Sequence, residues 1–248
     1  MSRLSSLLHA LAQRRALKVI SGLQNTDAAS VLTIVRAAAE GGATWVDIAA
    51  QPELVRHVRA SVELPVCVSA VDPQALAVAV AAGADMVEIG NYDSFYASGR
   101  TFSAAEVLAL TQATRALLPT VLLSVTVPHT LPLDQQVTLA EQLVTYGADL
   151  IQTEGGTSSA PIHSGTLGLL EKAAPTLAAT YEISRAVAVP VLCASGLSTV
   201  TVPLAVAAGA AAVGVGSAVN RLQDPVAMVA QVRSLVEALH QVPTGIRA

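Results

Sequence analysis

Charged side chains occur inside otherwise apolar stretches of this chain, where a charge needs a chemical or structural reason. Lys18 stands in one such stretch, and Asp47 and Glu88 stand in two others. A buried ammonium group is costly unless it is paired, so a structural Lys18 either forms an ion pair with Asp47 or Glu88 or lies at the rim of the fold and reaches solvent. A lysine in this setting can instead have a lowered pKa and act as a base or form an imine with a carbonyl substrate. A hard cation held by Asp47 and Glu88 is a further alternative.

A fourth charged candidate, Glu154, ends an apolar stretch directly before Gly155 and Gly156. A carboxylate at the end of a strand is well placed to take a proton from a carbon next to a carbonyl group. The structural alternative is that it only accepts hydrogen bonds from the loop backbone. Lys18, Asp47, Glu88 and Glu154 are therefore the predicted catalytic residues.

Glycines and serines follow the last two apolar stretches as Ser195-Gly196 and Gly216-Ser217. Glycine lets an anion approach backbone N–H groups without a Cβ in the way, and serine hydroxyls can donate further hydrogen bonds. Gly155 and Gly156 belong to a third such loop. All six residues are predicted to bind phosphate, whereas the plainer alternative is that the glycines only let the chain turn.

Four further polar residues are predicted to orient a substrate: Asn91, His129, Gln152 and Thr157. The evidence for His129 is weak because a loop histidine between prolines is more often a surface or capping residue. No pair of His with Asp or Glu at helical spacing suggests a zinc site, and no Cys-x-x-Cys motif occurs, so no metal site is predicted.

Eight β-branched apolar stretches are the predicted strands that must position these residues. They are Ala16–Gly22, Trp45–Ala50, Val66–Ala70, Met86–Asn91, Val121–Val127, Leu150–Glu154, Val191–Ser195 and Ala212–Gly216. Segments with apolar spacing of three and four residues lie between them, and two of these begin after the capping residues Asp27 and Ser103. A short amphipathic helix is predicted near the N-terminus, before the first strand.

A Gly-Ala sequence opens the second, fourth, sixth and eighth strands, beginning at Gly42, Gly83, Gly147 and Gly209. The glycine is predicted to end a helix in the left-handed conformation, so that the chain turns directly into the next strand. This rhythm favours a closed (β/α)₈ barrel of residues 1–248 as a single domain. An open doubly wound sheet is less consistent with it, because a Gly-x-Gly-x-x-Gly turn is missing after the first strand.

Composition narrows the class of partner. Net charge is −4 with 14 Lys+Arg and 18 Asp+Glu, and basic residues form no run that could follow a nucleic-acid backbone. The uncharged stretch of residues 186–220 is interrupted by prolines and glycines, which argues against a membrane span. The two cysteines stand in apolar strands and imply no disulfide, so a soluble protein of a reducing compartment is expected, with a homo-oligomer left open.

Five longer sequences resemble one family closely. They are Lys18–Leu23, Val46–Ala50, Glu88–Tyr96, Ser124–Gln136 and Gln152–Ser159. They resemble the hypothetical chloroplast reading frame twenty-three (ycf) family of cyanobacteria and plastids. The resemblance covers nearly the whole chain and implies an aldolase-type TIM barrel located in the cytoplasm, or in the stroma if the gene is plastid-encoded. It implies no particular activity and no catalytic residues.

Three functions are consistent with these residues. The first is a lyase or isomerase acting on a phosphorylated carbonyl compound by acid–base or imine chemistry, with no cofactor. The second is an oxidoreductase that uses flavin mononucleotide, since the same two loops can hold the phosphate of that cofactor. The third is a sensor or scaffold that binds a phosphorylated metabolite without catalysis. In each of them the predicted partner is a small phosphorylated molecule at the barrel mouth.

Overall fold

The computed structural model describes residues 3–156 and 159–241 and has the predicted architecture. Parallel strands form a closed barrel in the order β1-β2-β3-β4-β5-β6-β7-β8. Their bounds are β1 Ala16–Ile20, β2 Trp45–Ala49, β3 Val66–Ala70, β4 Met86–Ile89, β5 Leu122–Thr126, β6 Leu150–Thr153, β7 Val191–Ala194 and β8 Ala212–Val215. The chain is an aldolase-type (β/α)₈ barrel, as predicted.

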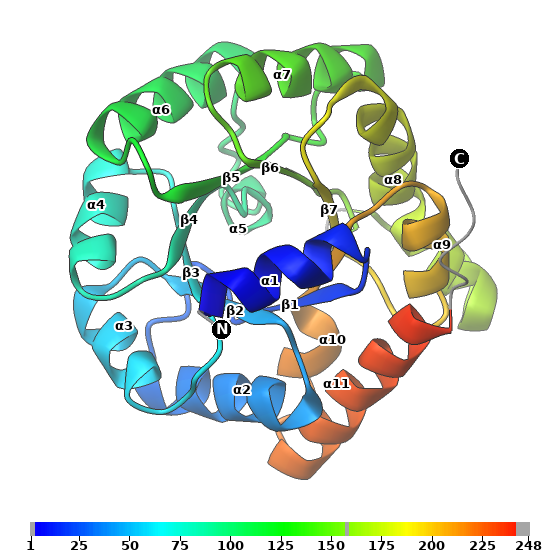
Figure 1. The fold of residues 1–248 in the computed structure, drawn as a ribbon. Helices are drawn as coiled ribbons and strands as arrows, with labels where there is room; N and C mark the ends of the chain where they lie inside the picture. The colour runs from blue at the N-terminus through cyan, green and yellow to red at the C-terminus, as the bar shows by residue number, and fades with distance from the viewer. Residues whose placement is uncertain (1–2, 157–158, 242–248) are drawn as a thin grey trace.

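Helices surround the strands and form the outer ring of the molecule (Figure 1). They are α2 Ala28–Gly41, α3 Pro52–Arg59, α4 Pro73–Ala81, α6 Ala104–Leu117, α7 Leu133–Thr145, α8 Gly165–Ala186, α9 Val202–Ala207 and α11 Pro225–His240. Among the described residues, no helix has the length and hydropathy needed to cross a membrane. The main apolar core lies between this ring and the outer face of the barrel.

The predicted turns and caps form as expected. Gly42, Gly83, Gly147 and Gly209 all have positive φ, between 88° and 114°, which L-residues with a Cβ rarely adopt. The Asp27 carboxylate accepts hydrogen bonds from the first turn of α2. Ser103 and Glu106 form a capping box at the start of α6.

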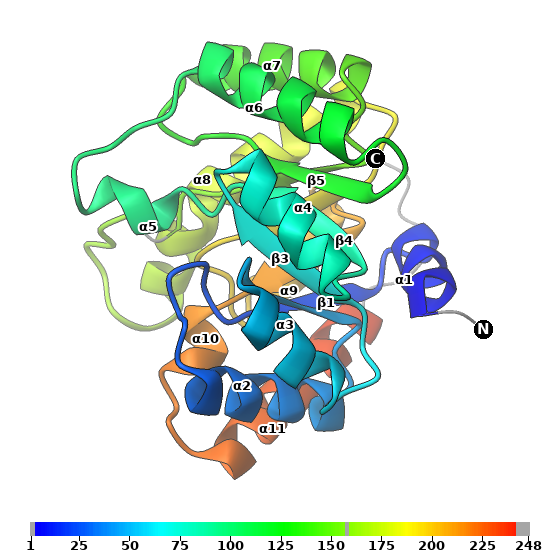
Figure 2. The ribbon, with the colours of Figure 1, turned by 90° about the vertical axis from the view of Figure 1, so that its left-hand side faces the viewer.

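The N-terminal helix α1, Arg3–Ala12, lies across the end of the barrel where the strands begin (Figure 1). Its Leu7 and Leu11 are buried against residues that open the strands, among them Trp45 and Met86. Figure 2 shows α1 and the short helix α5, Asp93–Tyr96, at opposite ends of the molecule. Because α1 closes one end with apolar side chains, the opposite end, which carries α5 and α10, Ser217–Asn220, is the one at which the described residues leave an opening for a small molecule.

Several strands end earlier than predicted. Asn91 and Ser195 have φ of 61° and 76°, a left-handed conformation that cannot continue a strand, so β4 and β7 end before them. These residues turn back over the barrel mouth, which places them at the candidate site.

Cys193 on β7 faces away from the barrel interior, because its thiol lies 3.6 Å from the Thr176 hydroxyl on α8. The lumen-facing neighbours on β7 are Leu192, which packs into the apolar end closed by α1, and Ala194, which lines the opening at the other end. A register shift of one residue would exchange these two faces of the strand.

Candidate active site

Lys18 is fully buried at the centre of the barrel, where acidic and amide side chains surround its ammonium group. Its Nζ lies 2.7 Å from Glu88 Oε2, 3.0 Å from Gln152 Oε1 and 3.3 Å from Asp47 Oδ2. The predicted ion pair with Asp47 and Glu88 is therefore present. The ammonium also occupies the position that a metal cation between these two carboxylates would need.

The two carboxylates below the mouth have partners on every oxygen. Asp47 accepts hydrogen bonds from the Ser69 hydroxyl at 2.6 Å and from Asn91 Nδ2 at 2.9 Å. Glu88 accepts from Ser124 Oγ at 2.8 Å, from Gln152 Nε2 at 2.8 Å and from Asn91 Nδ2 at 3.2 Å. We call Lys18, Asp47, Ser69, Glu88, Asn91, Ser124, Thr126 and Gln152 the lumen network; Thr126 accepts from Gln152 Nε2 at 3.0 Å.

The charges of this network fix its protonation. Burial alone lowers the pKa of Lys18. The nearby carboxylates of Asp47 and Glu88 raise the pKa by more than burial lowers it, so the net pKa lies above its ordinary value and the amine is protonated. Burial raises the pKa of Glu88, and Lys18 opposes this shift. A protonated, fully paired lysine is not a nucleophile, so the geometry favours the ion-pair alternative over an imine-forming Lys18.

Asn91 forms the boundary between the network and the mouth. Its left-handed backbone turns the amide down onto Asp47, Ser69 and Glu88, while the residue also lines the cavity above. The preceding Gly90 makes this turn possible because a Cβ there would lie 2.1 Å from Thr126 Oγ1. Asn91 and Gln152 both line the cavity, but both are also held by hydrogen bonds within the network. That they contact a substrate therefore stays a prediction.

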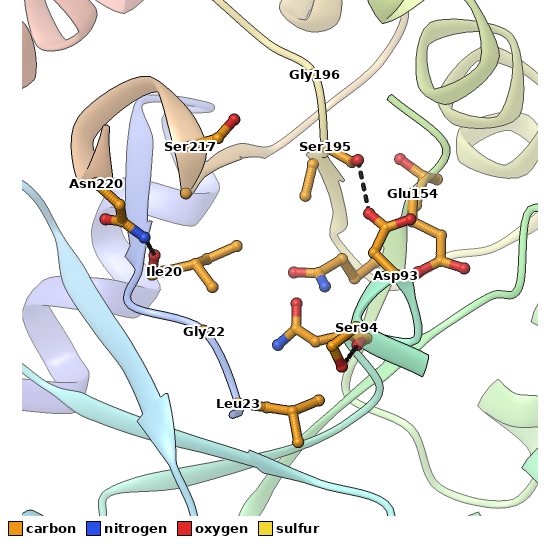
Figure 3. A pocket seen from close by; sticks show the side chains of 15 residues that line it. Ile20, Gly22, Leu23, Asp93, Ser94, Glu154, Ser195, Gly196, Ser217 and Asn220 are labelled. Atoms are coloured by element: carbon orange, nitrogen blue, oxygen red, sulfur yellow. Dashed lines mark hydrogen bonds between the residues drawn. The ribbon is translucent and has the colours of Figure 1, made fainter. Parts of the chain in front are cut away.

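A cavity of about 200 Å³ opens above Asn91 at the ends of the strands. Four of the six predicted phosphate-binding residues line it: Ser195, Gly196, Gly216 and Ser217, which we call the glycine wall. Figure 3 shows Ser217 and Asn220 on one side of this cavity and Asp93 and Glu154 across from them. Asn220 Nδ2 donates to Ile20 O at 3.0 Å, which ties α10 to the end of β1.

Gly155 and Gly156 do not line this cavity but support it from behind. A Cβ on Gly156 would lie 2.4 Å from Gly196 Cα, so the two loops pack backbone against backbone. A Cβ on Gly155 would lie 2.9 Å from Pro175 on α8. These contacts favour a packing role for both glycines, whereas Thr157 lies outside the described residues.

Three side chains with metal-ligating or acid–base chemistry meet on the far side of the cavity: Asp93, His129 and Glu154, here called the mouth triad. Glu154 follows β6, and His129 follows β5; their side chains approach to 3.2 Å between Nδ1 and Oε1. The Tyr96 hydroxyl on α5 donates to the same Glu154 oxygen. Ser195 Oγ donates to Asp93 Oδ2 at 2.9 Å.

The second oxygen of each carboxylate has no such partner: Asp93 Oδ1 and Glu154 Oε2 are buried and make no hydrogen bond. Burial raises the pKa of Glu154, although the hydrogen bond from His129 opposes this. For His129, burial lowers the pKa, but the hydrogen bond and charge of Glu154 raise it overall. The triad therefore contains two unpartnered carboxylate oxygens, on residues that line the cavity, and an imidazole beside them.

The sequence identified Glu154 and His129 separately, but not that they form a pair. Asp93 and Tyr96 were not identified as site residues. The structure places both on α5, a single helical turn held by the packing of the buried Tyr92 on Phe102, with ring centroids 4.4 Å apart. An aspartate and an aromatic hydroxyl three residues apart, on one turn after a strand, is the pattern that could have indicated them.

Comparison of the whole chain with known proteins decides the family. A family described as "Protein of unknown function (DUF561)" matches residues 1–244. The chain belongs to the DUF561 family. It is 43% identical over 220 residues to the "Uncharacterized protein ycf23" of Cyanophora paradoxa, covering 88% of this chain and 90% of that protein. It is 38% identical over 244 residues to the protein of the same description from Cyanidium caldarium, with 98% and 96% covered.

Solved structures similar to this member of the DUF561 family include enzymes of phosphorylated compounds. A 3-hexulose-6-phosphate synthase aligns with a TM-score of 0.64 and 19% identity, over 90% of this chain and 99% of that one. The (S)-3-O-geranylgeranylglyceryl phosphate synthase of Thermoplasma acidophilum, in complex with sn-glycerol-1-phosphate, aligns with a TM-score of 0.65 and 14% identity, over 98% and 100%. At these identities the similarity shows the aldolase-type fold.

Proposed function

We propose that this barrel binds a small phosphorylated carbonyl compound at its mouth and acts on it as a lyase or isomerase. The observation that carries the proposal is the cavity itself, with the glycine wall on one side and the paired carboxylates of Asp93 and Glu154 on the other. One side suits an anion and the other suits a reacting carbon, so a ligand with a phosphate at one end fits both.

The glycine wall supports the phosphate half of the proposal. It consists of the loops after β7 and β8, the position at which many barrels of this architecture hold a phosphate. Gly196 has a φ of 75°, and both Gly196 and Gly216 line the cavity. Two structural neighbours are named for enzymes of phosphate esters, which is in keeping with a phosphate at this place.

The carboxylates support the reaction half. Lyases and isomerases of this class form negative charge on the carbon or oxygen of a carbonyl group. A carboxylate with a raised pKa helps such a reaction by taking the proton from the neighbouring carbon, and a carboxylate that holds a cation helps by polarising the carbonyl. Glu154 lines the cavity, with one oxygen accepting from Tyr96 and the other without a hydrogen-bond partner, so either role brings it next to the reacting carbon.

A thermal-shift screen tests the proposal. The purified chain is heated with sugar phosphates, other phosphate esters, inorganic phosphate and flavin mononucleotide, and each ester is compared with its unphosphorylated alcohol. A ligand at 100 times its Kd adds about 2.7 kcal/mol, or roughly 5–10 °C for a domain of this size. We expect a shift with a small phosphate ester and none with its alcohol.

The other results are also informative. Stabilisation by flavin mononucleotide with visible absorbance of bound flavin would replace the proposal with the oxidoreductase alternative. A bound ester that is never converted, with the mouth triad intact, would indicate the sensor alternative. No shift from any phosphate compound would overturn the phosphate site.

A further inference from the structure

The mouth triad brings together one imidazole and two carboxylates from three different parts of the fold. Asp93 opens α5, His129 follows β5 and Glu154 follows β6. One ligand atom from each side chain can be chosen so that all three lie within 4.8 Å of one another. Convergence of three metal-ligating groups from separate strand ends is a specific arrangement, unlike acidic residues that neighbour one another along a surface helix.

Two carboxylate oxygens of this triad are buried and have no hydrogen-bond partner. Glu154 is 3% exposed, and its Oε2 has no hydrogen-bond partner; Asp93 Oδ1 is likewise buried and unpartnered. Leaving a buried charged acceptor unsatisfied costs more than leaving a neutral one, so native structures rarely do so without a ligand or ion. Both residues line the cavity, which means that the missing partner can come from there.

The negative charge of the cavity lining also favours binding of a cation. Its described lining contains the two carboxylates and no lysine or arginine. A phosphate ester at the glycine wall would add further negative charge to the same small volume. This step alone rests on the proposed function; the unpartnered oxygens do not depend on it.

One distance within the triad is close to that between two ligands of a metal ion. Two ligands at right angles, each about 2.1 Å from one ion, lie about 3.0 Å apart. His129 Nδ1 and Glu154 Oε1 are 3.2 Å apart. The Ser195 hydroxyl on Asp93 and the Tyr96 hydroxyl on Glu154 supply the hydrogen bonds that typically orient ligating carboxylates.

We propose that Asp93, His129 and Glu154 form a binding site for a divalent transition-metal cation such as Mn²⁺ or Zn²⁺. One nitrogen and two carboxylate ligands suit these ions better than Mg²⁺ or Ca²⁺, which prefer oxygen alone. Three protein ligands leave positions open toward the cavity, where a carbonyl or hydroxyl oxygen of the ligand can bind. The cation then polarises the carbonyl group and offsets the charge of the phosphate.

The test is calorimetric titration of MnCl₂ into the full chain after EDTA dialysis, with no phosphate compound present. We expect one Mn²⁺ per chain, and a loss of at least tenfold in affinity for Asp93→Asn and for His129→Gln. The matched control is Asp72→Asn, which makes the same chemical change at the exposed N-cap of α4, where asparagine caps equally well. Its affinity should equal that of the original chain.

A spectroscopic measurement keeps the test valid if a variant fails to fold. Pulsed electron paramagnetic resonance of Mn²⁺ bound to the unmutated chain should show coupling to an imidazole nitrogen. Absence of Mn²⁺ and Zn²⁺ binding at millimolar concentration would overturn the site, and so would binding that lacks nitrogen coupling or is unaffected by both triad variants.

Failure of this site is distinguishable from failure of the proposed function. The phosphate screen is run once with EDTA and once with MnCl₂, whereas the metal titration contains no phosphate. Metal binding without any phosphate shift would leave the cation site standing and overturn the phosphate proposal. A thermal shift with phosphate compounds in EDTA, without metal binding in the titration, would leave the phosphate site standing and overturn the cation site.

Discussion

The barrel contains the same three kinds of side chain at two levels, an aspartate, a glutamate and a basic residue. In the lumen network, Asp47 and Glu88 surround the ammonium of Lys18, and both oxygens of each carboxylate have a partner. In the mouth triad, Asp93 and Glu154 lie beside His129, and each keeps one buried oxygen without a partner. The lower group is complete within the chain, whereas the upper group is incomplete until something binds.

This difference separates structural from functional carboxylates by a physical criterion rather than by residue type. Carboxylates that are satisfied internally stabilise one arrangement of the barrel and gain nothing from a ligand. Carboxylates left unsatisfied in a cavity lower the stability of the empty protein and recover it when a cation or donor arrives. Loss of stability should therefore follow changes in the lumen network, and loss of binding should follow changes at the mouth.

The largest expected effect is that of Lys18→Met in the lumen network. Methionine has a similar length but no charge, so Asp47 and Glu88 would remain buried without their cation. Removing one partner of a buried ion pair typically costs about 3–5 kcal/mol. The free energy of unfolding from urea titration should fall by that amount, and an unchanged value would mean that the network does not hold the fold.

A pair of isosteric changes two residues apart should have different effects. Asn91→Asp adds a third carboxylate beside Asp47 and Glu88 and removes a donor from both, and we expect a loss of about 1–3 kcal/mol. Asp93→Asn in the metal-free protein removes a charge from a carboxylate with one unpartnered oxygen and keeps an acceptor for Ser195, so its stability should change by less than about 0.5 kcal/mol or increase. Equal losses in urea titrations of both variants would contradict the distinction between the two regions.

The glycine wall can be tested without changing either group of charges. Ser217 is exposed and opens α10, so Ser217→Asp should fold normally while placing a carboxylate where the phosphate is proposed to lie. Repulsion should weaken binding of the phosphate ester found in the screen at least tenfold, or about 1.4 kcal/mol. Ser217→Asn is the control of equal size, and equal weakening in calorimetry of both variants would indicate a steric effect instead.

The sequence was sufficient for the barrel because that inference depends on repetition. Four Gly-Ala turns and eight apolar strands occur at regular spacing. Each turn needs a glycine in the left-handed conformation, and the position of a glycine can be read directly from the sequence. The ion pair of Lys18 was also predictable, since a charge in an apolar strand must find a partner within the barrel. Local rules are enough for such features.

The mouth triad depends on contacts that no local rule describes. Glu154 and His129 lie 25 residues apart, and their contact depends on how two loops turn after their strands. Asp93 reaches the cavity because Gly90 and Asn91 adopt positive φ, and the sequence gives no reason to expect a left-handed asparagine there. The inner and outer faces of β7 cannot be assigned from the sequence either, since both faces of that strand are apolar and alternation carries no signal.

The smallest expected effect is a pH dependence that comes from the lumen network. The folded pKa of Glu88 is raised above its ordinary value of 4.5, mainly by burial, so the folded chain holds this proton more tightly than the unfolded chain. Its contribution to the free energy of unfolding is therefore largest at acid pH and falls as pH rises through the folded pKa. Lys18 adds nothing to this slope near neutral pH: its raised pKa gives stability that is complete below its ordinary value of 10.5 and is lost only at more alkaline pH.

Glu88→Gln isolates that contribution because glutamine keeps the size but has no proton to lose. Its amide NH₂ faces donors on whichever side it lies, so the variant is less stable at every pH and only the slopes are compared. Between pH 5 and pH 8 the melting temperature of the original chain should fall more steeply than that of Glu88→Gln. His129 also has a raised pKa, so its contribution to the free energy of unfolding likewise falls as pH rises. Part of the slope should therefore remain in Glu88→Gln and become smaller in the double variant with His129→Gln. If Glu88→Gln leaves the slope unchanged, Glu88 does not titrate in this range, and the charge of the lumen network is then constant while that of the mouth varies with pH.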